Sequence, residues 1–285
     1  MGKRRAYMQI FFRTDGGERL KAVLKYPGGK WRIAEWIIAH FPAHAVYLEP
    51  YFGSGAIFFM KAPAGIETVN DLNGDIVNLF RVCRERGEEL ARLIELTPFS
   101  RREYVECYVR SDDPLEQARR TLVRYWQSFG STDSSKHSWK NSQTKNSPRC
   151  PIRFAELPKI ILETLSRLRE VQIENYDAVS LIKKYDSPDT LIYLDPPYIE
   201  STRKKGLYKT DMTDKQHEEL LKTIKASKSK ICLSAYDNEL YNEELKEWET
   251  DEKPTTAQMG LHRTEKLYMN YDPPWLLTGG KNNDN

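Results

Sequence analysis

The segment Asp195-Pro196-Pro197-Tyr198 has the side chains and the spacing for a defined chemical task. It follows a short apolar run, and prolines directly after a buried strand end that strand and stiffen the turn, because proline has no backbone N–H to donate. The Asp195 carboxylate and the Pro196 carbonyl would then be fixed as adjacent acceptors for the two N–H groups of an exocyclic amine. Tyr198 offers an aromatic face on which an extruded base could stack. The alternative is a strand-ending proline turn with a packed tyrosine.

A second proline pair, Asp272-Pro273-Pro274-Trp275, lies near the end of the sequence. It has tryptophan in place of tyrosine, and no strand-helix unit follows it. We therefore assign it to the end of the folded chain rather than to chemistry.

A glycine-bearing turn lies upstream, at Glu49-Pro50-Tyr51-Phe52-Gly53-Ser54-Gly55. It connects an apolar run at 46–48 to an apolar helical segment at 56–60. Glycine lets the backbone approach a ligand closely, and open α/β sheets bind ligands at the carboxyl ends of their strands. The turn therefore indicates a ligand site, although a tight strand-to-helix turn without a ligand would use the same glycines.

Asp71 ends the next apolar run, about 20 residues beyond the glycine turn. In nucleotide-binding sheets an acid at this spacing reaches a ribose hydroxyl, so Asp71 favours an adenosine-type ligand. The alternative is that Asp71 caps a helix that begins near Gly74.

A further candidate is the turn Lys25-Tyr26-Pro27-Gly28-Gly29-Lys30, which an amphipathic segment follows. Backbone N–H groups at the start of a helix, together with a lysine, could hold a carboxylate such as that of a methionine moiety. A simple capped turn is the alternative.

Alternating strands and helices must position these segments. Short apolar runs predict buried parallel strands at 46–48, around Val69 and at 191–194, with further strands at 171–173, 231–233 and 267–271. Apolar spacing near 3.6 predicts helices at 31–41, 75–95, 157–168 and 213–224, the last capped by Thr213. This order predicts an α/β chain with a doubly wound, mostly parallel sheet.

Composition excludes several classes of protein. The chain has 285 residues with 39% hydrophobic and 30% charged residues, and no apolar run approaches the roughly 18 residues of a membrane span. The basic start of the chain lacks the apolar region of an export signal, so we expect a cytoplasmic, nucleoid-associated protein of prokaryotic or phage type. The four cysteines form no CxxC pair, so we expect neither a metal site nor a disulfide framework.

The stretch 84–155 interrupts the strand-helix alternation and predicts an inserted, mainly helical lobe between catalytic segments 1–83 and 156–285. Although the net charge is only +3, residues 124–153 contain six basic residues against the single acid Asp133. The basic residues are Arg124, Lys136, Lys140, Lys145, Arg149 and Arg153. This segment could follow DNA phosphates, and a solvated surface loop is the alternative.

Taken together, these segments resemble the Dam-like group of DNA adenine-N6 methyltransferases. The matching pieces, in chain order, are Tyr26-Pro27-Gly28-Gly29-Lys30, Glu49 to Gly55, Asn70-Asp71, Asn175-Tyr176-Asp177 and Asp195-Pro196-Pro197-Tyr198. The resemblance covers most of the chain outside the inserted lobe. It implies a Rossmann-like methyltransferase fold and S-adenosylmethionine as cofactor.

The resemblance also implies roles for individual residues. The catalytic residues would be Asp195, Pro196, Pro197 and Tyr198. S-adenosylmethionine would be bound by Tyr26, Gly29, Lys30, Glu49, Pro50, Phe52, Gly53, Gly55, Asp71, Tyr176, Asp177 and Asp195, with Tyr176 and Asp177 beside its adenine ring.

In the resembled family the lobe between the cofactor and proline motifs reads DNA, so double-stranded DNA is the expected partner. The lobe mixes aromatic, polar and basic residues, as base readout and phosphate contacts require. We expect DNA contacts from Arg124, Trp126, Ser128, Trp139 and Lys140, and from Arg203 and Lys204. The last two belong to a basic segment, 199–211, predicted to close over DNA, for which an ordinary solvated loop is the alternative.

These features lead to a mechanistic hypothesis. The adenine N6 lone pair is delocalised into the ring, and acceptance of both N6 hydrogens by Asp195 and the Pro196 carbonyl would direct it toward an activated methyl group. The base must be flipped out of the duplex, at a cost of about a few kcal/mol. No metal is needed for such a transfer.

Two other functions are compatible with the sequence. Cytosine N4 presents the same two hydrogens, although the resemblance favours adenine, and an inactive DNA-binding module could share the fold. A restriction–modification setting would add a cognate restriction nuclease as a partner. We expect a monomer.

Overall fold

The structure is a computed structural model that describes residues 19–129, 138–141, 144–145, 147, 149–199, 212–256 and 262–274. Two predicted DNA contacts, Arg203 and Lys204, lie outside the described residues, as do residues 200–211 of the loop predicted at 199–211. Lys136 and Asp133 of the basic segment also lie outside them.

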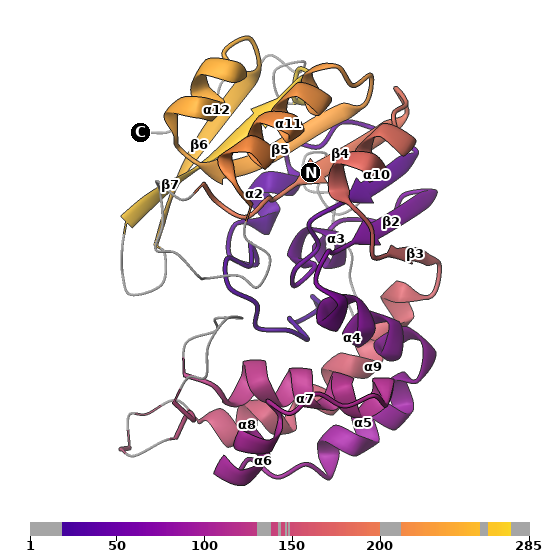
Figure 1. The fold of residues 1–285 in the computed structure, drawn as a ribbon, viewed down its shortest axis with the longest axis vertical. Coiled ribbons are helices and arrows are strands. Elements are labelled where there is room, and N and C mark those ends of the chain that lie inside the picture. Colours follow the sequence, from indigo (N-terminus) through magenta and orange to yellow (C-terminus); the bar gives the residue numbers. More distant parts are fainter. Residues whose placement is uncertain are drawn as a thin grey trace, which may run out of the picture.

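A seven-stranded sheet forms one half of the described chain (Figure 1). In sheet order, the strands are β3 (Val171–Glu174), β2 (Ile66–Asn70), β1 (Val46–Glu49), β4 (Thr190–Leu194), β5 (Lys230–Tyr236), β7 (His262–Met269) and β6 (Glu249–Thr256). The strands from β3 to β5 pair in parallel, whereas β7 is antiparallel to both β5 and β6. The predicted α/β class with a mostly parallel, Rossmann-like sheet is confirmed.

The order of the strands reverses between β1 and β4. On one side of β1 the sheet continues through β2 to β3, and on the other through β4 to β5. Leu48 of β1 lies opposite Ile192 of β4, so the carboxyl ends of these two strands are neighbours. Such a switch point is where open α/β sheets bind ligands. The fold therefore brings the glycine turn after β1 next to the proline motif after β4.

Alternation along the central strands gives the sheet two buried faces. Tyr47 and Tyr193 belong to one hydrophobic cluster, which also includes the buried residues of the helical half. Their sequence neighbours Leu48 and Ile192 belong to a second cluster on the opposite face. Burial on both faces explains why these strands are short continuous apolar runs in the sequence.

The helices fall into two groups (Figure 1). The sheet is accompanied by α2 (Ala34–Ile38), α3 (Ala56–Met60), α10 (Ala178–Lys184), α11 (Asp214–Lys225) and α12 (Glu239–Glu244). The helical half consists of α4 (Gly74–Glu85), α5 (Gly87–Glu95), α6 (Arg101–Glu106), α7 (Pro114–Gln127), α8 (Cys150–Ala155) and α9 (Leu157–Leu168). Because α4 and α9 pack on α5 and α7, the helical half extends beyond 84–155, and the boundaries of the predicted lobe stay a prediction.

Some predicted helices have different bounds in the structure. The single helix predicted at 75–95 is divided at Arg86, whose backbone is not helical. The helix predicted at 31–41 is shortened to α2, since the turns that place Lys30 continue to Ile33. Thr213 caps α11 in a reciprocal capping box with Gln216, as the sequence predicts. Within the described residues, no helix combines the length and the apolar character needed to cross a membrane.

Strand β6 has no counterpart in the sequence prediction. Its sequence, Glu249-Thr-Asp-Glu-Lys-Pro-Thr-Thr256, is charged and contains a proline. It pairs only with β7, at the edge of the sheet, where charge and proline are tolerated because one side of the strand faces no neighbour. An edge position therefore explains a strand without an apolar pattern.

A buried ion cluster joins the helical half to the sheet. Arg167 of α9 donates two hydrogen bonds to the Glu67 carboxylate of β2, at 2.5 and 2.9 Å, and a third to the Phe58 carbonyl of α3. Lys61, directly after α3, donates to the same carboxylate at 2.5 Å. The side chains of Arg167, Glu67 and Lys61 are all at most 4% exposed. Elements from both halves thus share one charged cluster.

Candidate active site

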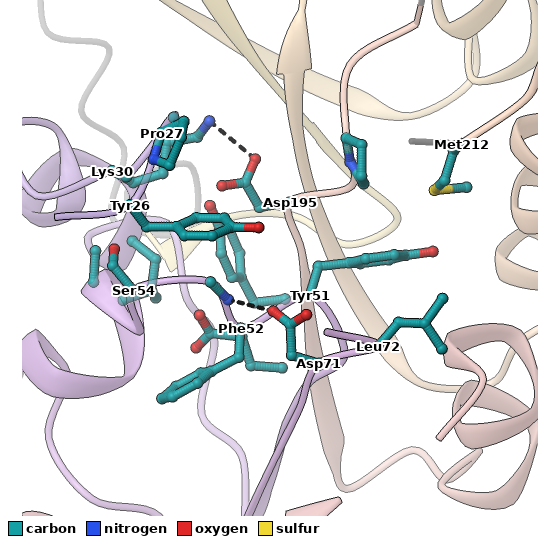
Figure 2. A pocket seen from close by; sticks show the side chains of 18 of the residues that line it. Tyr26, Pro27, Lys30, Tyr51, Phe52, Ser54, Asp71, Leu72, Asp195 and Met212 are labelled. Atoms are coloured by element: carbon teal, nitrogen blue, oxygen red, sulfur yellow. Dashed lines mark hydrogen bonds and ion pairs between the residues drawn. The ribbon is translucent and has the colours of Figure 1, made fainter. Parts of the chain in front are cut away.

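A cavity opens at the carboxyl ends of β1 and β4, at the switch point of the sheet (Figure 2). With its open mouth counted, the empty space of the cavity is about 820 Å³. It is lined by Tyr26, Pro27, Gly28, Gly29, Lys30, Glu49, Tyr51, Phe52, Gly53, Ser54, Ala56, Ile57, Asp71, Leu72, Tyr193, Asp195, Pro197, Met212 and Gln216. Segments that are far apart in the sequence meet here.

Asp71 holds the glycine turn in place. Its carboxylate accepts hydrogen bonds from the Gly53 and Asn73 backbone N–H groups, both at 2.8 Å. The cap of α4 is Asn73, whose side chain accepts a hydrogen bond from the Asp75 N–H. The alternative in which Asp71 caps this helix is therefore wrong. Gly53 has a positive φ of 51°, and a Cβ at this position would lie 3.0 Å from the Tyr26 ring. The turn therefore requires glycine where it lines the cavity.

Pro50 and Gly55, two predicted cofactor residues, lie outside the cavity lining. Gly55 begins α3 with a φ of 66°, and a Cβ there would approach the Phe52 ring to 2.5 Å. The Pro50 carbonyl accepts a hydrogen bond from the Asn70 side chain at 2.9 Å. Both residues shape the turn from behind, whereas Phe52 and Gly53 face the ligand space.

Glu49 ends β1 and is buried beside the cavity. Tyr47 donates a hydrogen bond to its carboxylate at 2.6 Å. Burial raises the pKa of Glu49 to about 8, to which the nearby Asp195 contributes. Glu49 is therefore mostly neutral at pH 7 and adds little negative charge to the site.

Lys30 is the centre of a buried charge network. Its ammonium lies 2.9 Å from the Asp195 carboxylate and 3.1 Å from the Glu265 carboxylate of β7, and it donates a hydrogen bond to the Tyr198 hydroxyl. Burial alone would lower the pKa of Lys30, but Asp195 and Glu265 raise it well above its ordinary value. Lys30 is therefore a permanent cation that faces carboxylates of the protein, in contrast to its expected contact with a cofactor carboxylate.

Asp195 is placed by β4 and by its neighbours. Besides the ion pair with Lys30, its carboxylate accepts a hydrogen bond from Ser234 of β5 at 3.3 Å. Burial raises the pKa of Asp195, while Lys30 opposes the rise. A carboxylate with a raised pKa can both accept hydrogen bonds and take up a proton near neutral pH.

Tyr198 is less open than the sequence suggests. Its side chain is buried, and its ring stacks on Tyr236 of β5, with centroids 3.9 Å apart and an interplanar angle of 10°. Its hydroxyl faces Lys30 and Glu265. One face of the expected stacking surface is thus covered by another aromatic ring in this conformation.

The segment Asn175-Tyr176-Asp177 lies at the edge of the site and lines no part of the cavity. Tyr176 is 53% exposed, and its backbone N–H and C=O both bond to the Asn70 side chain. Asp177 caps α10 by accepting from the Ser180 N–H. Asn70 thus ties this segment to the turn after β1.

The motifs that meet at this cavity all lie within a longer family match. The profile of the family described as "D12 class N6 adenine-specific DNA methyltransferase" matches residues 26–261. This chain belongs to that family. Membership of the D12 family implies a methyl donor and a DNA substrate in general terms. Within the described residues, no His, Cys, Asp and Glu side chains form a cluster that could hold a metal ion.

Three individual relatives are between 21% and 27% identical to this chain. A Type II methyltransferase, M1.LlaDCHI, of Lactococcus lactis subsp. cremoris is 27% identical over 199 residues, which are 63% of this chain and 66% of the relative. A DNA adenine methylase of Salmonella typhi is 21% identical over 240 residues, covering 78% and 83% of the two chains. One of Escherichia coli (strain K12) is 23% identical over 188 residues, covering 62% and 65%. The first and third matches span just under two thirds of the relatives.

Two of the predicted DNA contacts of this D12 chain are buried, and a third is mostly covered. Trp126 and Ser128 are 6% and 4% exposed, and the Trp126 indole N–H donates to the Val23 carbonyl. Arg124 is 15% exposed and lies 3.6 Å from the buried Asp75 carboxylate of α4. In this conformation these side chains pack within the protein, so direct DNA contacts by them stay a prediction that their burial does not favour.

The other two predicted contacts of the lobe lie nearer the surface. Trp139 is half-buried and donates a hydrogen bond to the Gln127 side chain, while the Arg101 guanidinium lies over its ring. Lys140 is also half-buried, and its backbone N–H donates to the Gln127 carbonyl. A role of Trp139 and Lys140 in DNA binding stays a prediction.

Sequence reasoning missed several residues of the D12 site, above all Glu265, Ser234 and Tyr236. All three come from strands β5 and β7, which pair in antiparallel fashion beside the proline motif. A signal for Glu265 does exist, because it shares the period-2 face of Leu267 and Met269, both buried. An acid on an otherwise apolar face of a strand indicates a buried partner.

Proposed function

We propose that this D12 methyltransferase transfers a methyl group from S-adenosylmethionine to N6 of an adenine flipped out of duplex DNA. The observation that carries the proposal is the position of Asp195, half-buried at the rim of a glycine-lined cavity and ion-paired with Lys30. The family match and the names of the relatives agree with this activity.

The residues around the cavity fit the proposed cofactor. The cavity combines a carboxylate, Asp71, with apolar groups such as Leu72, which is 60% exposed at its edge. Gly53 leaves space against Tyr26 that a Cβ would fill. An adenosine needs such a set, with an acceptor for ribose hydroxyls and an apolar surface for its ring. When bound, S-adenosylmethionine supplies a methyl group activated by a sulfonium sulfur.

On the acceptor side, the chain's own residues would hold the amine. Asp195 would accept one N6 hydrogen and the Pro196 carbonyl the other, which turns the nitrogen lone pair toward the cavity. After transfer the nitrogen carries one proton too many, and Asp195 would take it. Its pKa, raised by burial, suits this role. Lys30 would orient the carboxylate before the amine arrives.

The stack of Tyr198 on Tyr236 suggests how the base is received. Two rings 3.9 Å apart leave no room for a third, so an entering adenine would separate them or stack on an outer face. Stacking energy of the order of 1–3 kcal/mol per base would replace the contact between the tyrosines. Tyr198 would thus exchange one aromatic partner, Tyr236, for another, the adenine, at little net cost in stacking energy.

Other features of the proposed setting are less specific. The printed name of the Lactococcus relative, a Type II methyltransferase, supports a restriction–modification context and hence a cognate nuclease. Action on DNA in the cytoplasm of a bacterium, or of a phage-infected one, agrees with the sources of the relatives. A monomer stays our prediction.

The test is to identify the methylated nucleoside. The purified protein would be incubated with mixed-sequence duplex DNA and labelled S-adenosylmethionine, and the DNA digested and separated. We expect N6-methyladenine, none with Asp195→Ala, and an unchanged yield with Asp272→Ala, which alters the exposed acid of the second proline pair. N4-methylcytosine would overturn the choice of base, and DNA binding without any label would favour the inactive module.

A further inference from the structure

Glu265 is a buried acid to which neither the motifs nor the family match assigns a role. It lies on β7, is 2% exposed, and reaches the catalytic cluster from an antiparallel strand some distance along the chain. Two buried carboxylates repel each other, so placing Glu265 beside Asp195 is unfavourable unless a cation compensates their charges. Lys30, 3.1 Å from Glu265, is that cation.

The Lys30 ammonium has three N–H donors, and three side chains surround it, two through ion pairs and one through a hydrogen bond. They are the Asp195 carboxylate at 2.9 Å, the Glu265 carboxylate at 3.1 Å and the Tyr198 hydroxyl. Two of the three belong to the proline motif that would hold the substrate amine. Glu265 is the acceptor that has no other task in the proposed reaction.

The amine and Lys30 compete for Asp195. An N6 hydrogen would approach the carboxylate that Lys30 already contacts, and a cation is the stronger partner. If Lys30 had Asp195 as its only anion, release of the carboxylate would leave a buried ammonium without a counter-charge. Glu265 removes this obstacle, since Lys30 can turn toward it when the amine arrives.

We infer that Glu265 is a positioning residue for methyl transfer: it holds Lys30 so that the Asp195 carboxylate is available to the adenine amine. The inference rests on the proposed function and adds to it a residue that touches neither the base nor the methyl donor.

The charges around the cluster are consistent with this role. The other titratable groups that face it are Glu49 of β1, Tyr193 of β4, Tyr198 and Tyr236. Burial raises the pKa of Glu49 to about 8 and that of each of Tyr193 and Tyr236 above its ordinary value, so these groups are mostly neutral at pH 7. Burial also raises the pKa of Glu265, Lys30 opposes that rise and Asp195 adds to it. When both carboxylates are ionised around Lys30, the cluster has one surplus negative charge. That surplus matches the positive charge that develops on the methylated amine.

The experiment compares Glu265→Gln, which removes the charge at constant shape, with Glu265→Asp, which keeps it. The readouts are the single-turnover rate of adenine methylation from pH 5 to 9, the affinity for S-adenosylmethionine, and the melting temperature. Glu252→Gln is the matched control, because Glu252 is an exposed acid of the neighbouring strand β6 that pairs with Lys266.

For Glu265→Gln we expect a plateau rate lower by roughly ten- to hundredfold with unchanged cofactor affinity. Methylation needs the ionised Asp195 carboxylate. Without the negative charge of Glu265, Lys30 stabilises that carboxylate more strongly and lowers the pKa of Asp195. The acidic limb of the rate profile should therefore move to lower pH, by about one unit. Glu265→Asp should keep the limb of the wild type and restore most of the rate, and Glu252→Gln should match the wild type.

Two results would overturn the inference. One is a Glu265→Gln variant whose methylation rate and whose acidic limb of the pH–rate profile are both those of the wild type. The other is a lower rate with an unmoved limb and a lower melting temperature, which is the pattern of a purely structural residue. A carbon-13 titration of the Asp195 carboxyl, without DNA or cofactor, tests the same competition apart from catalysis. An inactive wild type with a lowered Asp195 pKa in Glu265→Gln would therefore refute the proposed function alone, and an unmoved titration would refute the role of Glu265.

Discussion

Asp195→Asn separates the chemistry of the site from its stability. The change keeps the shape of the side chain and removes one of the two negative charges that face Lys30. Asparagine can offer only one acceptor and no charge to the amine. Loss of a charged acceptor that acts in the transition state typically lowers a rate by about 10²–10³-fold, or ~3–4 kcal/mol. We expect a loss of this size in single-turnover methylation.

The fold should tolerate the same change. Removal of the Asp195 charge costs Lys30 one charge-assisted hydrogen bond, about 1.5–3 kcal/mol, but it also relieves the desolvation of a buried carboxylate, which is of similar size. Glu265 at 3.1 Å still neutralises Lys30. The free energy of unfolding should therefore change by less than about 2 kcal/mol, a melting shift of no more than a few degrees.

The assay uses labelled S-adenosylmethionine with excess enzyme over DNA, together with thermal melting and DNA affinity by fluorescence anisotropy. Asp272→Asn, in the second and exposed Asp-Pro-Pro sequence, is the matched control and should behave as the wild type. Methylation by Asp195→Asn within threefold of the wild-type rate would refute the role of the carboxylate. A collapse of the folded state would refute the charge balance around Lys30.

Three further changes test other parts of the structure. Gly53→Ala places a methyl group 3.0 Å from the Tyr26 ring at a φ of 51° and should weaken S-adenosylmethionine binding by roughly tenfold, since the positive φ alone costs about 1–2 kcal/mol; wild-type affinity in calorimetry would contradict it. Burial raises the pKa of Glu49 from 4.5 to about 8, so between these pH values the folded state keeps a proton that the unfolded chain loses. The free energy of unfolding should therefore fall as pH rises through this window, by up to about 1.4 kcal/mol per pH unit. Urea unfolding of Glu49→Gln at pH 6, 7 and 8 should show a flatter dependence, and parallel curves would exclude the buried neutral carboxyl. Arg124→Met should lower the free energy of unfolding by about 2 kcal/mol, because Asp75 loses a buried partner, yet leave the slope of DNA affinity against salt unchanged; a reduced slope would return Arg124 to the DNA contacts.

The sequence predicts the parts of the fold that are encoded locally. Apolar runs that end in Glu49, Asn70 and Asp195 give the central strands, and the position of those residues at strand ends places them at one edge of the sheet. Proline and glycine mark the turns, because their backbone restrictions are independent of context. The centre of the site is therefore predictable without the structure.

The remaining parts of the site depend on pairing between distant segments. Glu265 reaches Lys30 only because β7 pairs with β5, opposite to Tyr236, and no local pattern specifies that register. Strand β6 lies at the edge of the sheet, where a charged sequence is tolerated, so neither its period nor its composition identifies it as a strand. These contacts are set by tertiary packing rather than by propensity.

The aromatic residues of the lobe show a different limit. Composition alone made Trp126 a DNA contact, but Ala118, Leu122 and Trp126 follow one another at intervals of four on α7, all on its buried face. Helical spacing thus contained the correct information. Mixed aromatic and basic composition indicates an interface only after the face of the helix has been determined.

The cluster of Glu67, Lys61 and Arg167 limits how the lobe predicted to read DNA could be exchanged. A chimera that joins foreign recognition helices at 84–155 keeps α9, whose Arg167 is fixed to β2 and α3. A graft that also replaces α9 without an arginine at this position would leave the buried Glu67 carboxylate with Lys61 as its charged partner and would remove two of its hydrogen bonds and one to the Phe58 carbonyl. Evolutionary or engineered swaps of specificity should therefore cut the chain before α9, or carry all three charges together.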